Sequence, residues 1–385
     1  MKCIINSLGK LLPQYPLENI CIPNQTLFID IETTGLYVRS SNIYMIGCIY
    51  LDQTQEPHSW QSIQWLATNY DDEINILNEF VKFSKSFKFL IHFNGNQFDI
   101  PYLKSKMEQF NIAFNFDKFE GIDIYRRISP YKNFLKLPNC KQKTIESFLT
   151  TTIREDKYSG KELIDIYHEY VLSQDENREN ILLLHNKEDL SGMLEIIAAL
   201  AIPDLFTMPI KVKRVQANHY QDINQHQCTE LIMELKLPSS LPCEVSYMAN
   251  DCYFTGIGND GKIRVPIYET ELKYFYSNYK NYYYLPKEDI AIHKSVATFV
   301  DKEYRQPAHA SNCYTRKISA YLPQWNTVFS PFFKKSYDDK ELFFELTDEL
   351  KTQREVFNLY AHHVLEMMAS TKSNCSAPSD DDKIS

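Results

Sequence analysis

The sequence lacks a paired-cysteine motif, a secretory leader and an uncharged apolar run of membrane-spanning length. Its nine cysteines are an odd number and include no CxxC pair, which favours reduced, cytoplasmic thiols over a disulfide framework or a zinc site. No signal-peptide core with a cleavage site stands at the N-terminus. The most apolar long stretch, 181–202, is interrupted by His185, Lys187, Glu188 and Asp189. We therefore expect a cytoplasmic protein that has no transmembrane helix and no membrane partner.

The chain also has no excess of basic residues. Lys and Arg number 41 against 50 Asp and Glu, which gives a formal net charge of −9. This charge argues against a general binder of polyanions, so a contact with nucleic acid must come from a local basic patch. The composition is otherwise that of an ordinary globular protein, apart from 26 Tyr and 23 Phe.

The length of 385 residues predicts two domains rather than one. After a poorly patterned lead-in, 1–25, we predict an α/β domain over 26–205 and a smaller α+β domain of unknown role over 206–368. The remainder, 369–385, is rich in Ser and Asp and is predicted to be a disordered acidic tail.

Hydrophobic patterns in the first domain predict a mixed sheet covered by helices. Strands are expected at 27–32, 43–51, 58–65 and 87–92, and helices from 71, from 98, and over 144–149, 160–172 and 181–202, the last stopping at Pro203. Three neighbouring strands followed by helix, strand and helix suit this architecture.

In the second domain the pattern changes to strand-like pieces separated by turn signals. Residues 259–261, Asn-Asp-Gly, predict a hairpin turn. Residues 286–289 predict a helix start with Pro near its first position, and a long helix fits 338–368. Eight aromatic residues crowd the stretch 268–284. They fit core packing or a domain interface better than a platform for stacking single strands.

The stretch 27–36, LFIDIETTGL, combines a buried-strand pattern with two acids. Side chains alternate across a strand, so Asp30 and Glu32 point to one face. Two neighbouring carboxylates repel each other and lose hydration at a cost unless something neutralises them. A hard divalent cation is the usual partner, because it prefers oxygen ligands.

Three further residues stand where they can complete such a site. Asp99 begins a helix just after a strand and a turn, so its carboxylate can point back to the sheet edge. His185 and Asp189 are four residues apart on the long helix and share one face. Converging carboxylates make a site for two Mg²⁺ or Mn²⁺ ions, which clamp the attacking and leaving oxygens of a phosphodiester. A nearby imidazole can take the proton from water.

Together these motifs resemble the signature of the DEDD (DnaQ-like) 3′–5′ exonuclease superfamily. FIDIETTGL, NGNQFD at 94–99 and HNKED at 185–189 correspond to its three motifs. The HNxxD form and GKELIDIYHEY are also similar to the bacterial YprB-like group. The resemblance covers 26–202 and implies a ribonuclease H-like fold with a mixed five-stranded sheet flanked by helices. It also implies two metal ions on Asp30, Glu32, Asp99 and Asp189, with His185 as general base.

One spacing departs from the family pattern. Histidine-type exonucleases usually place four residues between the base and the last aspartate, whereas three separate His185 from Asp189, as in the tyrosine-type group. One residue turns a helix by about 100°, so His185 stands where that group carries tyrosine. We predict His185 as the base, with a water-orienting role as the alternative. Each motif alone also fits a structural role, and only the three in order favour a nuclease.

A stretch with six basic and no acidic residues, 126–143, is the predicted contact for a nucleic-acid backbone. Tyr131 and Phe134 within it are candidates to stack on a base, and a solvated loop face is the alternative. Arg154 is a weaker candidate for a phosphate contact. The predicted nucleic-acid-binding residues are Thr33, Asn94, Arg126, Arg127, Lys132, Lys136, Lys141 and Lys143.

The sequence thus predicts a metal-dependent nuclease with two divalent cations, Mg²⁺ or Mn²⁺. A 3′–5′ exonuclease on single-stranded DNA or RNA is favoured, because a flexible strand can reach a buried acid cluster at a sheet edge. Two alternatives stay open. One is a nucleic-acid-binding or scaffold protein with an inactive nuclease fold, and the other is a structure-specific endonuclease of the same fold.

Overall fold

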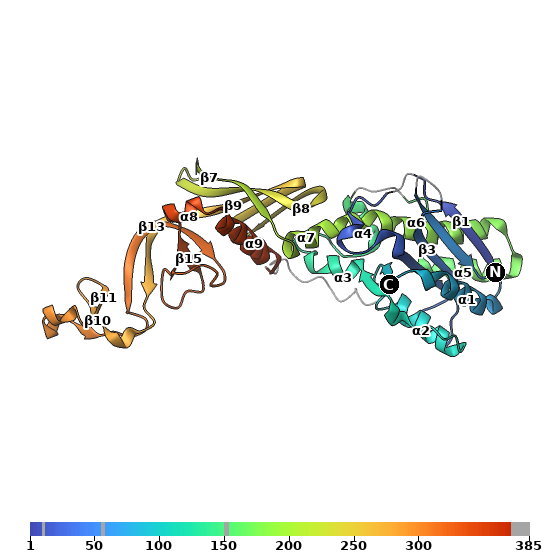
Figure 1. Ribbon diagram of the computed structural model, residues 1–385, viewed down its shortest axis with the longest axis horizontal. Coiled ribbons are helices and arrows are strands. Elements are labelled where there is room, and N and C mark those ends of the chain that lie inside the picture. Colours follow the sequence, from blue (N-terminus) through green and yellow to red (C-terminus); the bar gives the residue numbers. More distant parts are fainter. Residues whose placement is uncertain (10–11, 55–57, 150–153, 371–385) are drawn as a thin grey trace. The chain divides into compact units, whose positions relative to one another are not determined.

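The computed structural model describes residues 1–9, 12–54, 58–149 and 154–370. The chain forms two units, each with its own six-stranded sheet (Figure 1). The first unit is Met1–Asp204 with Leu241–Cys243, and the second is Leu205–Ser240 with Glu244–Ser385. Of the predicted tail, Ala369 and Ser370 are helical, and the rest lies outside the described residues.

The sheet of the first unit has the strand order β1-β4-β3-β2-β5-β6. Its strands are β1 (Lys2–Ser7), β2 (Thr26–Thr33), β3 (Ile43–Asp52), β4 (Ser59–Leu66), β5 (Phe89–His92) and β6 (Glu120–Asp123). The pairs β1–β4, β4–β3 and β3–β2 are antiparallel. The pairs β2–β5 and β5–β6 are parallel. The predicted mixed sheet flanked by helices is confirmed.

The sixth strand comes from the segment predicted to be a lead-in. β1 pairs antiparallel with β4, from Lys2 opposite Leu66 to Ser7 opposite Gln61. Residues 1–25 therefore belong to the sheet, which has six strands rather than five. The side chains of β1 are exposed or half-buried, so they leave no hydrophobic pattern. The strand is joined through its backbone, which the sequence does not display.

Helices cover both faces of this sheet. They are α1 (Glu73–Phe83), α2 (Asp99–Gln109), α3 (Ile124–Ile128), α4 (Gln142–Leu149), α5 (Gly160–Ser173), α6 (Glu176–Ile196) and α7 (Ala201–Thr207). On one face α6 contacts β2, β3 and β4, and Gln64 points towards it. On the other face, the Phe83 ring of α1 packs 5.0 Å from Tyr50 and 5.5 Å from Trp65, measured between centroids.

Helix α6 approaches the sheet closely at Gly47 in β3. Asp30, Gly47 and Gln64 are opposite one another on three adjacent strands. The Asn186 side chain of α6 donates to Asp30 Oδ2 at 2.8 Å and accepts from Gln64 Nε2 at 3.0 Å. A Cβ at position 47 would overlap Asn186 Oδ1 and lie 2.7 Å from Leu190 Cδ1. Only glycine leaves room for this polar bridge.

The helical run Glu176–Thr207 is longer than predicted. It begins before residue 181, and the prediction that it ends at Pro203 is wrong. Pro203 stands in the first turn of α7, where proline is tolerated. By length and composition the run could cross a membrane, but 78% of its most apolar window is buried inside the protein. Such burial is typical of a core helix.

The second unit is rich in strands. Its larger sheet has the order β14-β15-β13-β9-β8-β7, and a three-stranded sheet has the order β11-β10-β12. The elements are β7 (Lys211–Gln221), β8 (Gln227–Ala249), β9 (Cys252–Phe275), β10 (Tyr282–Leu285), β11 (Ile290–His293), β12 (Gln306–Pro307), β13 (Tyr314–Gln324), β14 (Phe332–Phe333), β15 (Leu342–Glu345), α8 (Asp348–Thr352) and α9 (Arg354–Ser370). Helix α9 contacts β7 and β9 and buries Phe357, Tyr360 and Val364.

Three local predictions for this unit are wrong. Residues 259–261 lie inside β9, and the β8–β9 hairpin turns at Asn250 and Asp251, whose φ angles are 46° and 59°. Residues 286–289 form the loop of the β10–β11 hairpin rather than a helix start. Within 338–368, β15 precedes the two helices. In each case strand pairing overrides the local signal.

The aromatic-rich stretch 268–284 contributes mainly to packing, as predicted. Tyr276 and Tyr282 stack with 4.6 Å between their ring centroids. Together with Tyr279 and Tyr284 they pack around a small core that contains Cys313.

The close approach of α6 predicts a strong effect of Gly47→Ala. We expect it to lower the free energy of unfolding by about 1–3 kcal/mol, as overpacking usually does. The matched control is Gly160→Ala at the start of α5, where a Cβ would meet nothing within 4 Å. That variant should be neutral or stabilised by up to about 1 kcal/mol. Equal stability of the two variants in urea unfolding would contradict the packing at Gly47.

Candidate active site

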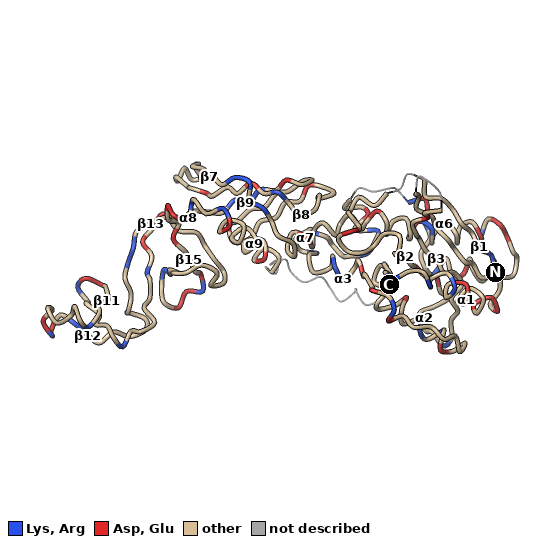
Figure 2. Tube along the Cα trace, in the orientation of Figure 1, with Lys and Arg blue, Asp and Glu red and all other residues tan. Residues whose placement is uncertain are grey.

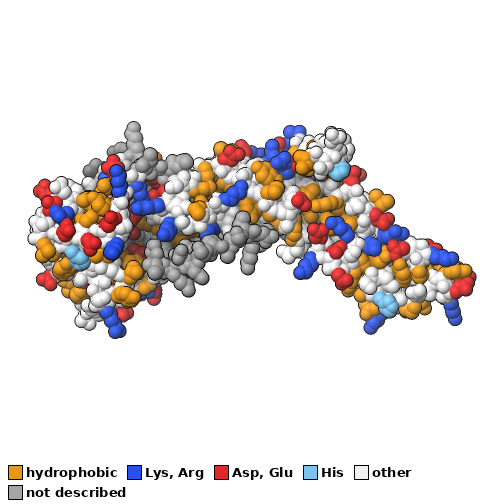
Figure 3. Space-filling model, turned by 180° about the vertical axis from the view of Figure 1, so that it is seen from behind, with side chains coloured by type: hydrophobic (Ala, Val, Ile, Leu, Met, Phe, Trp, Pro, Cys, Tyr) orange, Lys and Arg blue, Asp and Glu red, His pale blue; other side chains and the backbone are white. Residues whose placement is uncertain are grey.

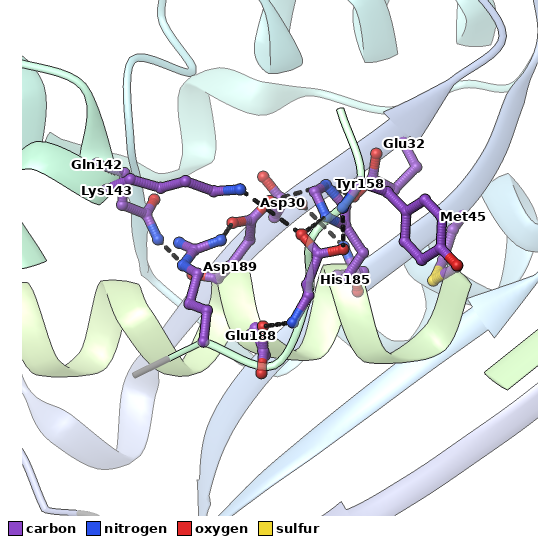
Figure 4. Close-up of polar contacts among 12 residues, drawn as sticks. Asp30, Glu32, Met45, Gln142, Lys143, Tyr158, His185, Glu188 and Asp189 are labelled. Atoms are coloured by element: carbon purple, nitrogen blue, oxygen red, sulfur yellow. Dashed lines mark hydrogen bonds and ion pairs between the residues drawn. The ribbon is translucent and has the colours of Figure 1, made fainter. Parts of the chain in front are cut away.

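Three elements of the first unit bring the predicted catalytic residues together. These residues are Asp30 and Glu32 from β2, Asp99 from the first turn of α2, and His185 and Asp189 from α6. The backbone N–H of Ile31, between the two β2 acids, donates to Asp99 Oδ1 at 3.2 Å. Figure 4 shows His185 and Asp189 projecting from α6 towards Asp30 and Glu32.

A bulge at the end of β2 places an aromatic ring beside the site. The register with β3 shifts between Glu32 and Thr33, so Tyr44 has no opposite residue on β2. Bulges redirect side chains, and the Tyr44 hydroxyl lies 3.5 Å from Glu32 Oε2. The buried Tyr44 ring stacks on Tyr167 of α5, with 4.4 Å between centroids. Glu32 therefore lies beside a buried tyrosine whose ring is held by stacking.

Burial raises the pKa values of these acids. Removal from water is the largest cause for Asp30, and the charges of Glu32, Asp189 and Asp99 add to it, so its pKa lies well above the usual range. Burial also raises the pKa of Glu32 to about 7, although the His185 ring opposes the shift. The pKa of Asp99 is raised to about 7, again mainly by burial. The cluster therefore favours bound protons or cations near neutral pH.

His185 is held between carboxylates at both ring nitrogens. Its Nδ1 lies 2.8 Å from Asp156 Oδ2, and its Nε2 lies 3.5 Å from Glu32 Oε1 and 3.2 Å from Asp189 Oδ2. Burial lowers the pKa of His185, but these carboxylates outweigh burial and the pKa is raised.

Arg154 places a positive charge on the same cluster. Its guanidinium forms an ion pair with Asp189 Oδ1 and a bidentate pair with Glu146 of α4, whose N–O distances are 2.7 and 2.6 Å. Gln142 of α4 donates to the Asp189 carbonyl at 2.8 Å. Arg154 thus contacts acids of the site, and these contacts do not support the predicted phosphate contact.

The donor set fits a divalent cation. Ligand atoms of Glu32, His185 and Asp189 lie within 4.8 Å of one another. Glu32 Oε1 is buried and accepts no hydrogen bond from the described residues. Carboxylate oxygens are the ligands that Mg²⁺ and Mn²⁺ prefer. The residues therefore suit the cations that the motif resemblance implies.

Two residues that the sequence analysis did not single out shape the site. Asn186 bridges Asp30 of β2 to Gln64 of β4, and the signal for it was an amide four residues from both Leu182 and Leu190, on the buried face of the helix. Asp156 holds His185 from a segment outside the regular elements. No periodicity or spacing in the sequence pointed to Asp156.

The motif residue Thr33 is the last residue of β2, and Asn94 lies two residues after β5, in the turn that leads to α2. The Thr33 hydroxyl donates to the Gly35 carbonyl at 3.1 Å. Asn94 has a φ of 59°, and its N–H donates to Asp123 Oδ1 at 3.0 Å. The Asn94 Oδ1 is buried and has no hydrogen-bond partner within the described residues. Their roles in nucleic-acid binding stay predictions.

The basic stretch 126–143 is mostly accessible. Arg126 and Arg127 lie on α3 and are exposed; Figure 2 shows Lys and Arg positions in blue at α3. Farther along, Lys132 is half-buried and Lys136, Lys141 and Lys143 are exposed. On the face seen in Figure 3, basic and acidic side chains are interspersed rather than gathered into one field.

Within this stretch, Lys143 reaches the site and Phe134 does not suit a binding role. Lys143 Nζ lies 3.6 Å from Asp156 Oδ2. Phe134 is only 2% exposed, so the prediction that it stacks on a base is wrong. Its apolar ring is part of the core, whereas Tyr131 is half-buried.

Comparisons with known proteins bear on the fold. Residues 27–201 match the family model of the RNase H superfamily, and with the mixed sheet this confirms a ribonuclease H-like fold for the first unit. No curated protein matches the chain. Among solved structures, the zinc-bound form of the Escherichia coli ExoI–ssDNA complex is similar at 10% identity, over 92% of this chain and 75% of that chain, with a TM-score of 0.26. At that TM-score the similarity supports no conclusion about this chain.

The raised pKa values predict how the stability of the metal-free protein depends on pH. A group whose pKa is higher in the folded than in the unfolded protein stabilises the fold at low pH, and this stabilisation is lost as pH rises through the folded pKa. For Glu32 and Asp99 that folded pKa is about 7. Asp30→Asn removes a carboxyl whose raised pKa costs stability as pH rises. In chelator, it should therefore raise Tm over wild type at about pH 7.5 more than at about pH 5.

The control for this prediction is Asp52→Asn. Hydrogen bonds from Thr54 keep the pKa of Asp52 below its usual range, so this variant should gain no stability as pH rises. If Asp30→Asn lowers Tm equally at both pH values, the charge repulsion described for the cluster is wrong.

Proposed function

We propose that the first unit is a metal-dependent nuclease that removes nucleotides from the 3′ ends of single-stranded DNA or RNA. The observation that carries the proposal is the convergence of four acids and one histidine from β2, α2 and α6 on one spot. Figure 4 shows Asp30, Glu32, His185 and Asp189 of this set. The match of residues 27–201 to the RNase H superfamily supports a nuclease. Assignment to the DEDD (DnaQ-like) group, and to its YprB-like branch, rests on the motif resemblance.

The proposed mechanism assigns a role to each of the five residues. Two divalent cations, Mg²⁺ or Mn²⁺, supply a clamp for the attacking and leaving oxygens when they are bound. They would be held by Asp30, Glu32, Asp99 and Asp189. His185 Nε2 faces this cluster and accepts the proton of the attacking water. The carboxylates raise the pKa of His185. Cations bound to these carboxylates would offset their charge and lower that pKa, which favours the neutral ring that a base needs.

A single strand is the proposed substrate because the acids are largely buried. Asp99 is 7% exposed, and the side chains of Glu32 and Asp189 are 14% and 22% exposed. A phosphate must therefore be brought down to the cluster, which a flexible strand does more readily than a duplex. Exposed Arg126, Arg127 and Lys143 are available to neutralise the backbone of such a strand. The proposal covers DNA and RNA alike.

The direct test uses a 5′-labelled single strand with Mg²⁺ or Mn²⁺. Wild type should produce a ladder of products shortened from the 3′ end. Asp30→Ala should abolish the ladder, because it removes a proposed metal ligand, whereas the matched Asp52→Ala variant should leave it intact. Reaction products are resolved on a denaturing gel.

Other outcomes of this test select the alternatives. Binding without cleavage, unchanged by Asp30→Ala, would overturn the proposal in favour of an inactive fold that binds nucleic acid. Internal cuts in a circular single strand, lost in Asp30→Ala, would replace the exonuclease with an endonuclease of the same site.

His185→Ala tests the general-base role separately. Removing a general base usually lowers the rate by about 10²–10⁴-fold, and we expect a loss in that range. The control is His168→Ala on α5, a histidine that pairs with Tyr70 instead of the acid cluster. A loss below about tenfold for His185→Ala would contradict the base role and favour a water-orienting one.

A further inference from the structure

The segment 154–156 is fastened to one face of α6. The Glu188 carboxylate accepts the backbone N–H groups of Glu155 at 2.8 Å and Asp156 at 3.0 Å. His185, Glu188 and Asp189 stand at i, i+3 and i+4, so they share this face. The same face therefore holds the segment and carries two of the proposed catalytic residues (Figure 4).

Asp156 is the member of the segment that contacts the imidazole. Its side chain is 1% exposed, and Oδ2 lies 2.8 Å from His185 Nδ1 and 3.6 Å from Lys143 Nζ. Its Oδ1 accepts the backbone N–H of Tyr158 at 3.1 Å. A buried carboxylate is costly unless it is paired, and both charged partners of Asp156 lie at the active site.

This contact decides which nitrogen of His185 carries the proton. A carboxylate accepts hydrogen bonds and donates none, so Nδ1 must be the donor and is assigned the hydrogen. In the neutral ring, Nε2 then keeps its lone pair and turns it towards Glu32 Oε1 and Asp189 Oδ2. The opposite tautomer would point an N–H at the site where a base must accept a proton.

We propose that Asp156 is a positioning residue of the nuclease, which fixes the Nδ1–H tautomer and the ring orientation of His185. The proposal rests on the proposed function of His185 at the site. The carboxylate of Asp156 is not needed to fasten the segment, because Glu188 binds the backbone and Arg154 pairs with Asp189 and Glu146. The Asp156 carboxylate is instead paired with the imidazole of His185. This histidine stands one helix position away from the base histidine of the histidine-type exonucleases.

The experiment compares full-length wild type, Asp156→Asn and Asp175→Asn, all with Mg²⁺. The side-chain amide of Asp156→Asn can donate to Nδ1, which moves the ring proton to Nε2. We expect kcat to fall by about 10²–10⁴-fold, with KM within about threefold and Tm nearly unchanged. Asp175→Asn is the matched control, because Asp175 caps the start of α6 and asparagine caps as well.

The deciding readout is the tautomer of His185, measured by ¹⁵N NMR of histidine-labelled protein at alkaline pH, where the ring is neutral. Wild type and Asp175→Asn should show hydrogen on Nδ1, and Asp156→Asn should show it on Nε2. A wild-type ring with hydrogen on Nε2 overturns the proposal even if Asp156→Asn does not fold. So does a kcat loss below about tenfold in Asp156→Asn.

The two proposals fail in different ways. If the wild-type protein shortens no single strand, the proposed nuclease function is wrong, whatever the result for Asp156→Asn. If the wild type is active and Asp156→Asn keeps both the His185 tautomer and the rate, only the positioning role of Asp156 is wrong. If the wild type is inactive but Asp156→Asn changes the His185 tautomer, Asp156 does orient His185, and only the proposed nuclease reaction is wrong.

Discussion

The docking of α6 on the sheet at Gly47 is the contact on which the candidate active site depends. Because position 47 has no side chain, Asn186 descends between Asp30 and Gln64 and hydrogen-bonds to both. A buried amide without partners is costly, so this bridge selects the depth and the rotation of the helix. His185, the preceding residue, is thereby turned towards the acids of β2. Packing and site geometry are set by the same contact.

The site concentrates negative charge where little water can screen it. Burial and mutual repulsion raise the pKa values of Asp30, Glu32 and Asp99, and the fold balances part of this charge with Arg154 and His185. Strongly shifted carboxylates in a shared buried spot are typical of functional sites. The cost in stability and the cation binding that we propose would have the same origin.

Much of the site could be predicted from the sequence, because its main residues lie in patterned elements. Period-2 alternation places Asp30 and Glu32 on one strand face, and an i, i+4 spacing places His185 and Asp189 on one helix face. Asp156 could not be predicted, since it lies in an irregular segment whose position depends on Glu188. The same holds for β1, which joins the sheet through backbone pairing, and for the hairpin turn at 250–251.

By itself, the sequence determined the order of the strands β2 to β5 and of the main helices that follow them, the set of acids and the face on which each acid lies. These follow from local geometry, because a residue's side-chain direction repeats with a fixed period along a strand or helix. Only the tertiary structure decided how deep α6 sits over Gly47, that Arg154 pairs with Asp189, and which carboxylate holds His185 Nδ1. Those contacts join segments far apart in the chain, and no local period reports a distance between such segments.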